Sequence, residues 1–154
     1  MAKKLSEHFG QANTEEVARA YLNELQRPYN YHDLYKIALR QIATEDAWLN
    51  SNIGVLFCDT DLITIKIWSQ VKYGKVDKRI LRLIDQRHYE LYLLCYPDIP
   101  WEPDPLRENP HNRPELFELY KEELMSYGKS FCLIEGSDYQ KRMETAVKAV
   151  SDFL

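Results

Sequence analysis

The sequence predicts an α/β fold in which short parallel strands alternate with helices. Three apolar runs of β-type composition stand out, at residues 53–58, 89–96 and 130–135. None of them alternates cleanly between apolar and polar residues, which is typical of parallel strands covered on both faces. Segments with helical periodicity lie before, between and after these runs, and strands that alternate with helices indicate βαβ units.

Five helices are predicted from apolar periodicity and from start and stop signals. They span residues 32–50, 62–73, 77–87, 114–127 and 139–153. Asp33 lies in the first turn of the first helix, where a carboxylate interacts favourably with the helix dipole. Gly74 and Gly128 follow the second and fourth helices as typical stop residues. We expect these helices to flank the sheet.

The first thirty residues give weaker signals. A short helix that ends at Gly10 is expected first, and Asn13 can cap a second helix that runs to Leu25 with Glu16 at its third position. Residues 11–16 show no strand character. No internal repeat and no domain boundary is visible, so residues 1–154 are expected to form a single domain.

Composition and charge exclude several classes of protein. Twenty basic and twenty-four acidic residues give a net charge of −4, so no overall positive field favours nucleic acid or an anionic membrane. The three cysteines each lie within an apolar run, which predicts buried, unpaired thiols in a reducing cytoplasm. The longest apolar runs have about six residues, far fewer than the ~20 that span a bilayer. The oligomeric state cannot be read from these features.

Six of the seven prolines lie in the nineteen-residue segment 96–114, which follows the second apolar run. Proline fixes φ and removes a backbone donor, so this segment is expected to be a shaped loop. Long loops often carry function, and Trp101, Arg107 and Arg113 give this one the composition of a ligand lid. The two arginines lie six residues apart and can close over one polyphosphate. The alternatives are arginines paired with neighbouring glutamates and a tryptophan that anchors the loop.

Polar and acidic residues follow each predicted strand. Ligands bind beyond the carboxyl ends of the strands in an open parallel sheet, so these residues are candidates for a site. Asp59 comes directly after the first run, where a carboxylate can hold hydrated Mg²⁺ beside the phosphates of a nucleotide. Asp61, two residues on, is either a second ligand or the cap of the next helix.

Several common motifs are missing from the sequence. There is no G-x-x-x-x-G-K-S/T phosphate loop, no G-x-G-x-x-G, no G-x-S-x-G and no H-E-x-x-H. The four histidines show no metal-ligand spacing. Serine hydrolases and zinc enzymes therefore have little support.

Three segments nevertheless resemble a known family. They are EVARAYL at residues 16–22, FCDTDLITIKIWSQV at residues 57–71 and LYLLCYPDIPWEPDPLRENPHNRPELFELYKEEL at residues 91–124. They are similar to the ribosylnicotinamide kinase domain of the bifunctional NadR-type NMN adenylyltransferase/kinase proteins, and the resemblance extends over nearly the whole chain. It implies a P-loop kinase fold and transfer of the ATP γ-phosphate to nicotinamide riboside, which gives NMN in NAD salvage. The implied partners are ATP, Mg²⁺ and a small-molecule nucleoside.

The resemblance also implies roles for individual residues. By position, Asp59 and Asp61 would hold magnesium, and Glu16 would take the proton of the acceptor hydroxyl or hold the ribose. The other implied contacts are Arg107 and Arg113 with phosphates, Arg19 with the acceptor, Asp98 and Trp101 with the nucleoside, and Ser137 and Asp138 near adenine.

The sequence departs from the family pattern at its amino terminus. The family begins with a strand, the phosphate loop and a helix whose later turns resemble AKKLSEHF, whereas this sequence begins within that helix. The family's second strand is not recognisable, and Val17 replaces a tyrosine of the acceptor motif. Phosphate-loop groups contribute ~3 to 4 kcal/mol each to transition-state stabilisation, so we expect a truncated form that is nearly inactive alone. Either the exposed strand edges close into a small three-stranded sheet, or the native protein is longer, which we favour. The alternative function is a non-catalytic, nucleotide-related binding or regulatory module.

Overall fold

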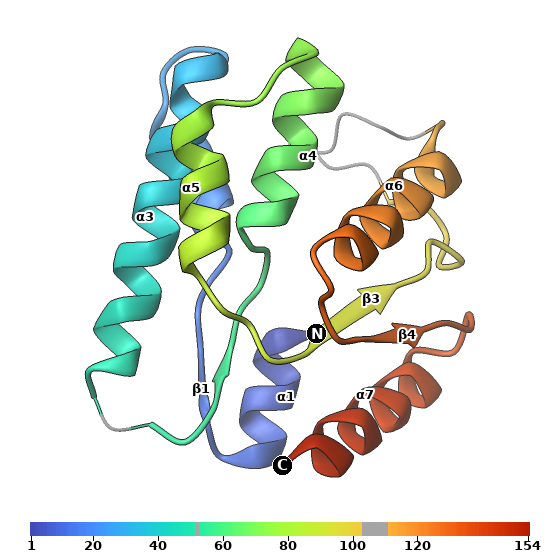
Figure 1. Ribbon diagram of the computed structural model, residues 1–154. Coiled ribbons are helices and arrows are strands. Elements are labelled where there is room, and N and C mark those ends of the chain that lie inside the picture. The colour runs from blue at the N-terminus through green and yellow to red at the C-terminus, as the bar shows by residue number, and fades with distance from the viewer. Residues whose placement is uncertain (52, 103–110) are drawn as a thin grey trace. The chain divides into compact units, whose positions relative to one another are not determined.

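The computed structural model describes residues 1–51, 53–102 and 111–154, and it has the predicted α/β architecture (Figure 1). In chain order the elements are α1 (Ala2–Phe9), β1 (Ala12–Asn13), α2 (Val17–Glu24), α3 (Tyr31–Leu49), β2 (Leu56–Phe57), α4 (Leu62–Tyr73), α5 (Lys78–Gln86), β3 (Tyr92–Cys95), α6 (Arg113–Ser126), β4 (Phe131–Ile134) and α7 (Tyr139–Phe153). The chain divides into two compact units, Met1–Arg87 and His88–Leu154. Each unit is described by itself.

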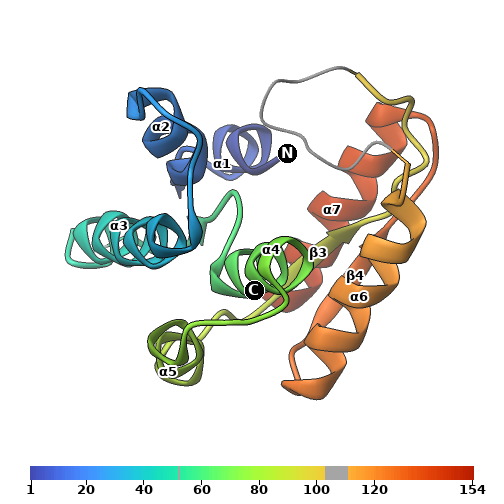
Figure 2. The same cartoon turned by 90° about the horizontal axis from the view of Figure 1, so that it is seen from above.

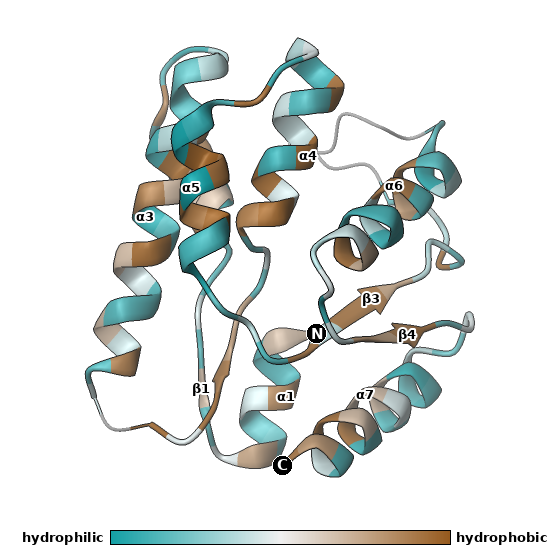
Figure 3. Ribbon diagram, in the orientation of Figure 1, coloured by the Kyte–Doolittle hydropathy of each residue, from teal (hydrophilic) through white to brown (hydrophobic). Residues whose placement is uncertain are grey.

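The first unit combines a short parallel strand pair with five helices. β1 pairs with β2 so that Ala12 lies opposite Leu56 and Asn13 opposite Phe57. α1 packs on this pair, while α3, α4 and α5 pack against one another (Figure 2). The apolar faces of these helices meet in the interior (Figure 3). The largest fully buried apolar side chains among the described residues of this unit are Leu5, Leu34, Ile37, Leu62, Ile63, Ile67 and Ile80.

Side-chain caps fix where α3, α4 and α5 begin. The Asn30 side chain accepts a hydrogen bond from the backbone N–H of His32 at 2.9 Å, and Asp33 completes a capping box. The Asp77 side chain accepts from the N–H of Arg79 at 2.9 Å and so caps α5. Gly74 ends α4 in the left-handed conformation, with φ 64°, which a residue with a Cβ adopts only with strain.

The second unit is a βαβα arrangement around one parallel strand pair. β3 pairs with β4 from Tyr92 opposite Phe131 to Cys95 opposite Ile134. α7 packs against β4, and Tyr96 makes an edge-to-face contact with Phe117 of α6 at a centroid distance of 4.8 Å. The buried side chains of this unit are Phe117, Leu124, Ile134, Arg142, Ala146 and Val150.

The amino-terminal region differs from the sequence prediction. β1 lies in a segment for which no strand was expected, and α2 begins at Val17 rather than directly after Asn13. Asn13 is not a helix cap, because its backbone pairs with Phe57 and its side chain accepts a hydrogen bond from Ser6 Oγ at 2.9 Å. The less favoured alternative, a small three-stranded sheet, is wrong for the described residues, since each parallel pair is a separate two-stranded sheet.

The cysteines are unpaired, as predicted, but they are not uniformly buried. Cys58 and Cys132 are half-buried, and Cys95 is exposed at the end of β3. Burial raises the pKa of the Cys58 thiol to about 12, and the nearby Glu45 carboxylate acts in the same direction. Cys58 is therefore protonated and unreactive at neutral pH.

Asp33 is a buried carboxylate that joins three segments of the first unit. Its side chain is fully buried, and its two oxygens accept hydrogen bonds from the Arg27 guanidinium at 2.7 and 2.9 Å. They also accept from the hydroxyl of Tyr21 at 3.0 Å and from the backbone N–H of Asn30 at 2.8 Å. The hydrogen bonds from Arg27 hold the pKa of Asp33 well below its usual range, against the opposing effect of burial.

We expect Asp33→Asn to lower the free energy of unfolding by about 2 kcal/mol near neutral pH, because an amide cannot replace these charge-assisted bonds. The pKa of Asp33 is lower in the folded state than in the unfolded state. Its contribution is therefore fully present above the unfolded pKa, ~4, and is lost as the pH falls toward the folded value. Urea unfolding should show a difference between wild type and variant that shrinks between about pH 6 and about pH 3.

Asp85→Asn is the matched control, because Asp85 is an exposed carboxylate on α5. This control should change stability by less than about 0.5 kcal/mol. A loss for Asp33→Asn that is the same at both pH values would contradict the assigned charge-dependent role.

Candidate functional site

The carboxyl ends of β1 and β2 bring two chain segments together. The backbone N–H of Thr14, directly after β1, donates to the carbonyl of Phe57 at 2.9 Å. The backbone N–H of Asp59 in turn donates to Thr14 Oγ1 at 3.4 Å. Thr14 is buried, so this contact fixes the segment that leads into α2 beside the turn that follows β2. Polar residues after both strands thus lie at one edge of the pair, as the parallel arrangement requires.

The turn after β2 is strained at Thr60. Thr60 has φ 70°, and it is the one residue other than glycine with positive φ within residues 1–51, 53–102 and 111–154. A β-branched residue adopts this conformation only when its surroundings impose it, and such strain is concentrated at functional sites. The turn leaves Asp59 exposed and turns Asp61 inward. Thr60 was expected among the polar residues after this strand, but its strained conformation was not predicted, although an apolar strand followed by D-T-D indicates a tight turn.

Asp61 caps α4 with both of its carboxylate oxygens. Oδ1 accepts from the backbone N–H and the hydroxyl of Thr64 at 2.9 and 2.7 Å, and Oδ2 accepts from the backbone N–H of Ile63 at 3.1 Å. Asp61 is 9% exposed. The capping interpretation is confirmed, and the role of Asp61 as a magnesium ligand stays a prediction.

A buried polar network, which was not predicted from the sequence, reaches the turn after β2 from α3. Gln41 Nε2 donates to Glu45 Oε1 at 2.7 Å and lies 3.5 Å from the carbonyl oxygen of Thr60. Arg87 Nε donates to Glu45 Oε2 at 2.8 Å, and its Nη1 donates to Asp46 at 2.6 Å. Glu45 is 1% exposed, so the guanidinium partner is what permits a buried charge here. Two polar residues four apart on the inner face of α3 are the sequence signal for such a network.

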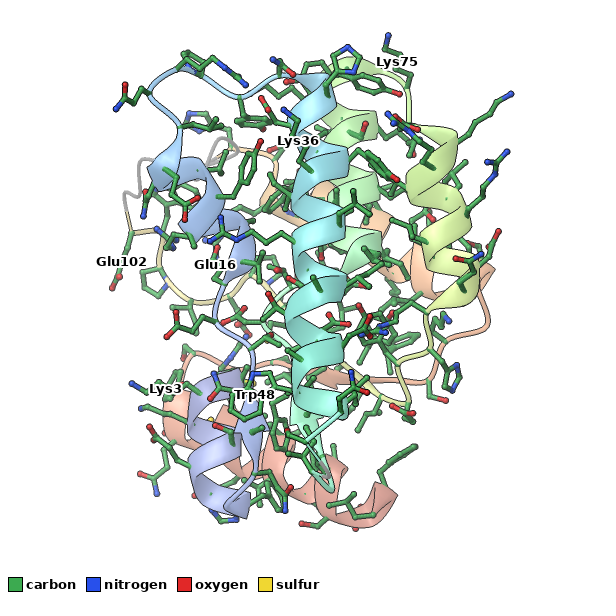
Figure 4. All side chains as sticks on the ribbon, turned by 90° about the vertical axis from the view of Figure 1, so that its left-hand side faces the viewer. Lys3, Glu16, Lys36, Trp48, Lys75 and Glu102 are labelled. Carbon is green, nitrogen blue, oxygen red and sulfur yellow. The ribbon has the colours of Figure 1, made fainter. Side chains whose placement is uncertain are left out.

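Glu16 and Arg19 lie at the start of α2 and form an ion pair. Glu16 is the N-cap residue, and its Oε2 accepts from Arg19 Nε at 2.8 Å. Each side chain is about one-third exposed, so both reach solvent at this edge of the first unit. Figure 4 shows Glu16 at the point where the chain enters α2. A partly exposed carboxylate beside a guanidinium can accept hydrogen bonds from the hydroxyl groups of a sugar.

In the second unit, Asp98 follows β3 and is bound to residues beyond β4. One carboxylate oxygen forms an ion pair with Nη1 of Arg142, and the other accepts a hydrogen bond from the backbone N–H of Gly136. The Asp98 side chain keeps 24% of its surface exposed. Its position is therefore set by structural bonds, and its predicted contact with a nucleoside is not tested by them.

Trp101 and Arg113 lie at the two ends of the predicted lid. The guanidinium carbon of Arg113 is 5.8 Å from the centre of the Trp101 ring, and Arg113 Nη2 donates to the carbonyl of Ile99 at 2.8 Å. Trp101 is half-buried, and Arg113 is the first residue of α6. Arg107 lies outside the described residues. The two ends of the lid thus contact each other within the second unit.

Ser137 and Asp138 form the exposed connection between β4 and α7. Asp138 caps α7, because its Oδ1 accepts from the backbone N–H groups of Gln140 at 2.8 Å and Lys141 at 3.4 Å. The predicted contact of these two residues with adenine is untested.

The residues that could bind a metal ion are individual carboxylates, and they do not form a cluster in the described part of the chain. No three His, Cys, Asp or Glu side chains gather in the part of the chain that the structure describes. Magnesium in phosphoryl-transfer sites commonly uses one or two carboxylates together with water and substrate phosphates, so the exposed Asp59 fits such an ion. No helix within the described ranges is long and apolar enough to cross a membrane.

Comparison with known proteins relates this arrangement to a family. A family model described as an AAA domain matches residues 1–142. Two relatives are each named the trifunctional NAD biosynthesis/regulator protein NadR, one from Escherichia coli strain K12 and one from Salmonella typhimurium strain LT2. Each is 26% identical over the whole chain. The chain spans 39% of the length of both relatives.

Solved structures show the same fold. A NadR protein in complex with NR matches 99% of this chain and 46% of its own, with a TM-score of 0.83 at 21% identity. A NadR protein in complex with NAD and AMP-PNP matches 99% of this chain and 44% of its own, with a TM-score of 0.78 at 19% identity. The predicted P-loop kinase-like α/β fold and the resemblance to NadR are confirmed. Because the family model covers most of its length, the chain belongs to the AAA-domain family.

Proposed function

We propose that this chain is the kinase-like part of an enzyme that phosphorylates nicotinamide riboside to NMN with ATP, in cytoplasmic NAD salvage. The observation that carries the proposal is the exposed Asp59 at a strained turn after β2, in a chain that matches NadR proteins over its full length. Similar proteins solved with NR and with AMP-PNP support a nucleoside acceptor and an ATP donor.

The proposed reaction forms one bond and breaks one bond. A ribose hydroxyl of the nucleoside attacks the γ-phosphorus of ATP, the bond between that phosphorus and the β–γ bridging oxygen breaks, and ADP leaves. The hydroxyl proton passes to the Glu16 carboxylate, which lies on the solvent-accessible start of α2. Arg19, paired with Glu16 at 2.8 Å, orients that carboxylate toward the acceptor.

Charge on the transferred group must be balanced by the protein and by magnesium. Asp59 would hold Mg²⁺, which neutralises charge on the β- and γ-phosphates. Arg113 has a guanidinium with five N–H donors, so it can contact a phosphate oxygen in addition to the carbonyl of Ile99. We further assign Arg107 to phosphate, Asp98 and Trp101 to the nucleoside, and Ser137 and Asp138 to the adenine side.

A non-catalytic binding module is the second candidate. The observation in its favour is that the 154 residues contain no G-x-x-x-x-G-K-S/T motif. Backbone amides and the lysine of that loop are the groups that hold the β- and γ-phosphates in P-loop kinases. The two candidates differ in whether ADP is released once a phosphate loop is supplied.

We expect the 154-residue chain to bind nicotinamide riboside but to release ADP only at background rate. A version extended at its amino terminus by the strand and phosphate loop of an E. coli NadR relative should release ADP in a riboside-dependent manner. A coupled ADP assay with and without the riboside makes this comparison. Background release by both forms, together with retained ligand binding, would favour the non-catalytic module.

Asp59→Asn should lower turnover of the extended form by about 10²- to 10³-fold, because a neutral amide holds magnesium poorly at the developing charge. Titration with Mg²⁺ should show that the loss is only partly restored at high metal concentration. Asp61→Asn is the matched control, since asparagine also caps a helix well. Equal losses for both variants at unchanged thermal stability would make Asp61 a second ligand, whereas full activity of Asp59→Asn would exclude the proposed metal role.

Glu16→Gln should weaken binding of nicotinamide riboside to the 154-residue chain by about tenfold, which corresponds to ~1.4 kcal/mol. The reason is that glutamine keeps the shape of the side chain but loses the charge that pairs with Arg19 and accepts from ribose hydroxyls. Isothermal titration calorimetry measures the change. The neighbouring exposed Glu15→Gln serves as control, and equal weakening by both variants would speak for a general charge effect instead of a specific contact.

A further inference from the structure

Arg142 is a buried cation to which neither the sequence prediction nor the proposed reaction gives a role. It lies on α7, four residues after the N-cap Asp138, and only 2% of its surface is exposed. Arginine is almost never fully buried unless its charge is paired. The environment of this side chain must therefore supply a carboxylate and further acceptors.

The guanidinium bridges the segments that follow β3 and β4. Nη1 forms an ion pair with Asp98 and also donates to the carbonyl of Gly136 at 3.2 Å, while Nη2 donates to the carbonyl of Tyr96 at 3.2 Å. Tyr96 and Asp98 come directly after β3, and Gly136 comes after β4. One side chain thus binds the segments at the carboxyl ends of both strands.

Asp98 links the guanidinium of Arg142 to the backbone of Gly136. Its second oxygen accepts a hydrogen bond from the backbone N–H of Gly136, so Asp98, Gly136 and Arg142 form a closed set of contacts. The set continues into the lid, because Ile99, next to Asp98, accepts from Arg113, and Arg113 lies against Trp101. Hydrogen bonds, the peptide link between Asp98 and Ile99 and the contact of Arg113 with the Trp101 ring therefore connect the loop after β4 with described residues of the predicted lid.

The energetics favour a role in positioning over a role in stability alone. Replacing a buried ion pair by well-packed apolar residues is often neutral or stabilising, because desolvation offsets most of the attraction. The Nε of Arg142 is buried without a hydrogen-bond partner among the described atoms, which adds to the cost of keeping the guanidinium here. Unlike an apolar side chain, the arginine fixes the geometry of the two backbone segments that follow β3 and β4.

We propose that Arg142 is a positioning residue that sets the spacing between residues 96–101 at the start of the lid and residues 135–138 after β4. The effect of this spacing on ligand binding rests on the proposed function, in which residues 96–101 contact the nucleoside and residues 135–138 lie near adenine. The planar fork of the guanidinium is essential, since it binds one carboxylate and two carbonyl groups in fixed directions. A lysine keeps the charge but cannot reach all three acceptors at once.

Hydrogen exchange of Arg142→Met tests the structural part of the proposal directly. Methionine preserves the apolar stem of the side chain. We expect the amide of Gly136, which donates to Asp98, and the amide of Tyr96, which donates to the carbonyl of Ile134, to exchange at least about tenfold faster, equivalent to ~1.4 kcal/mol of lost protection. Lys141→Met, one residue away and exposed, should leave both segments unchanged. Asp98→Asn should reproduce the pattern of Arg142→Met. Faster exchange in residues 135–138 alone, or in neither segment, would overturn the proposal.

Arg142→Lys keeps the proposal testable if the methionine variant does not fold. It retains the buried charge, so it should fold with the exchange pattern of Asp98→Asn. Wild-type exchange in both segments of the lysine variant would show that charge alone is sufficient, which contradicts the positioning role of the fork.

Titration with AMP-PNP separates positioning from general stability. In the phosphate-loop-extended form, Arg142→Lys should bind the nucleotide about tenfold more weakly while its thermal midpoint stays within a few degrees of wild type. Unchanged nucleotide affinity despite faster exchange would reject the role in ligand positioning. If the extended wild type binds neither AMP-PNP nor nicotinamide riboside, the proposed function fails, and hydrogen exchange still decides whether Arg142 fixes the two segments.

Discussion

Parallel pairing of very short strands determines where the described candidate residues that follow these strands lie. Because β1 runs parallel to β2, and β3 to β4, the segments that leave each pair emerge at the same edge. β1 and β2 have only two residues each, so backbone ladders alone hold them weakly. Bonds formed just beyond the strands complete the arrangement, through Thr14 in the first unit and Asp98 in the second.

In both units, buried charged side chains connect different segments of the chain. Asp33, Glu45 and Arg142 each have 2% or less of their surface exposed, and each is bound by a partner from a different segment. A charged pair is a poor source of net stability, but it is sensitive to geometry, because each unmet bond is costly in a low dielectric. These side chains therefore specify how loops and helix ends are held, while the apolar faces of the helices supply the favourable burial.

The sequence predicted the helices well because their signals are local. α4 and α7 agree with the prediction at both ends, where Asp61 and Asp138 act as caps and Gly74 stops α4. β1 could not be predicted from Ala12 and Asn13, because its extended conformation comes from pairing with a distant strand. The three apolar runs were predicted correctly as strands, but the predicted strands are longer than the observed ones. The backbone hydrogen bonds of a strand end where no neighbouring strand lies beside it.

The candidate site was predicted in its composition and less well in its geometry. Acidic residues after the strands were expected, and Asp59 is exposed there as a ligand would require. Asp61 and Asp138 cap helices, a role that an aspartate at the start of a helix does not distinguish in the sequence from contact with a ligand. The burial of Arg142 could not be predicted from the sequence, because an arginine in an amphipathic helix is usually solvated. Only the fold shows that this side chain is enclosed.

Chemical-shift mapping of nicotinamide riboside binding to ¹⁵N-labelled protein would show whether the riboside contacts the residues assigned to it. We expect the largest shifts at the amides of Glu16, Arg19, Asp98 and Trp101, the residues assigned to the acceptor and the nucleoside. This assignment would be contradicted by saturating binding whose shifts all lie elsewhere, or by no shift at any concentration at which the riboside is soluble.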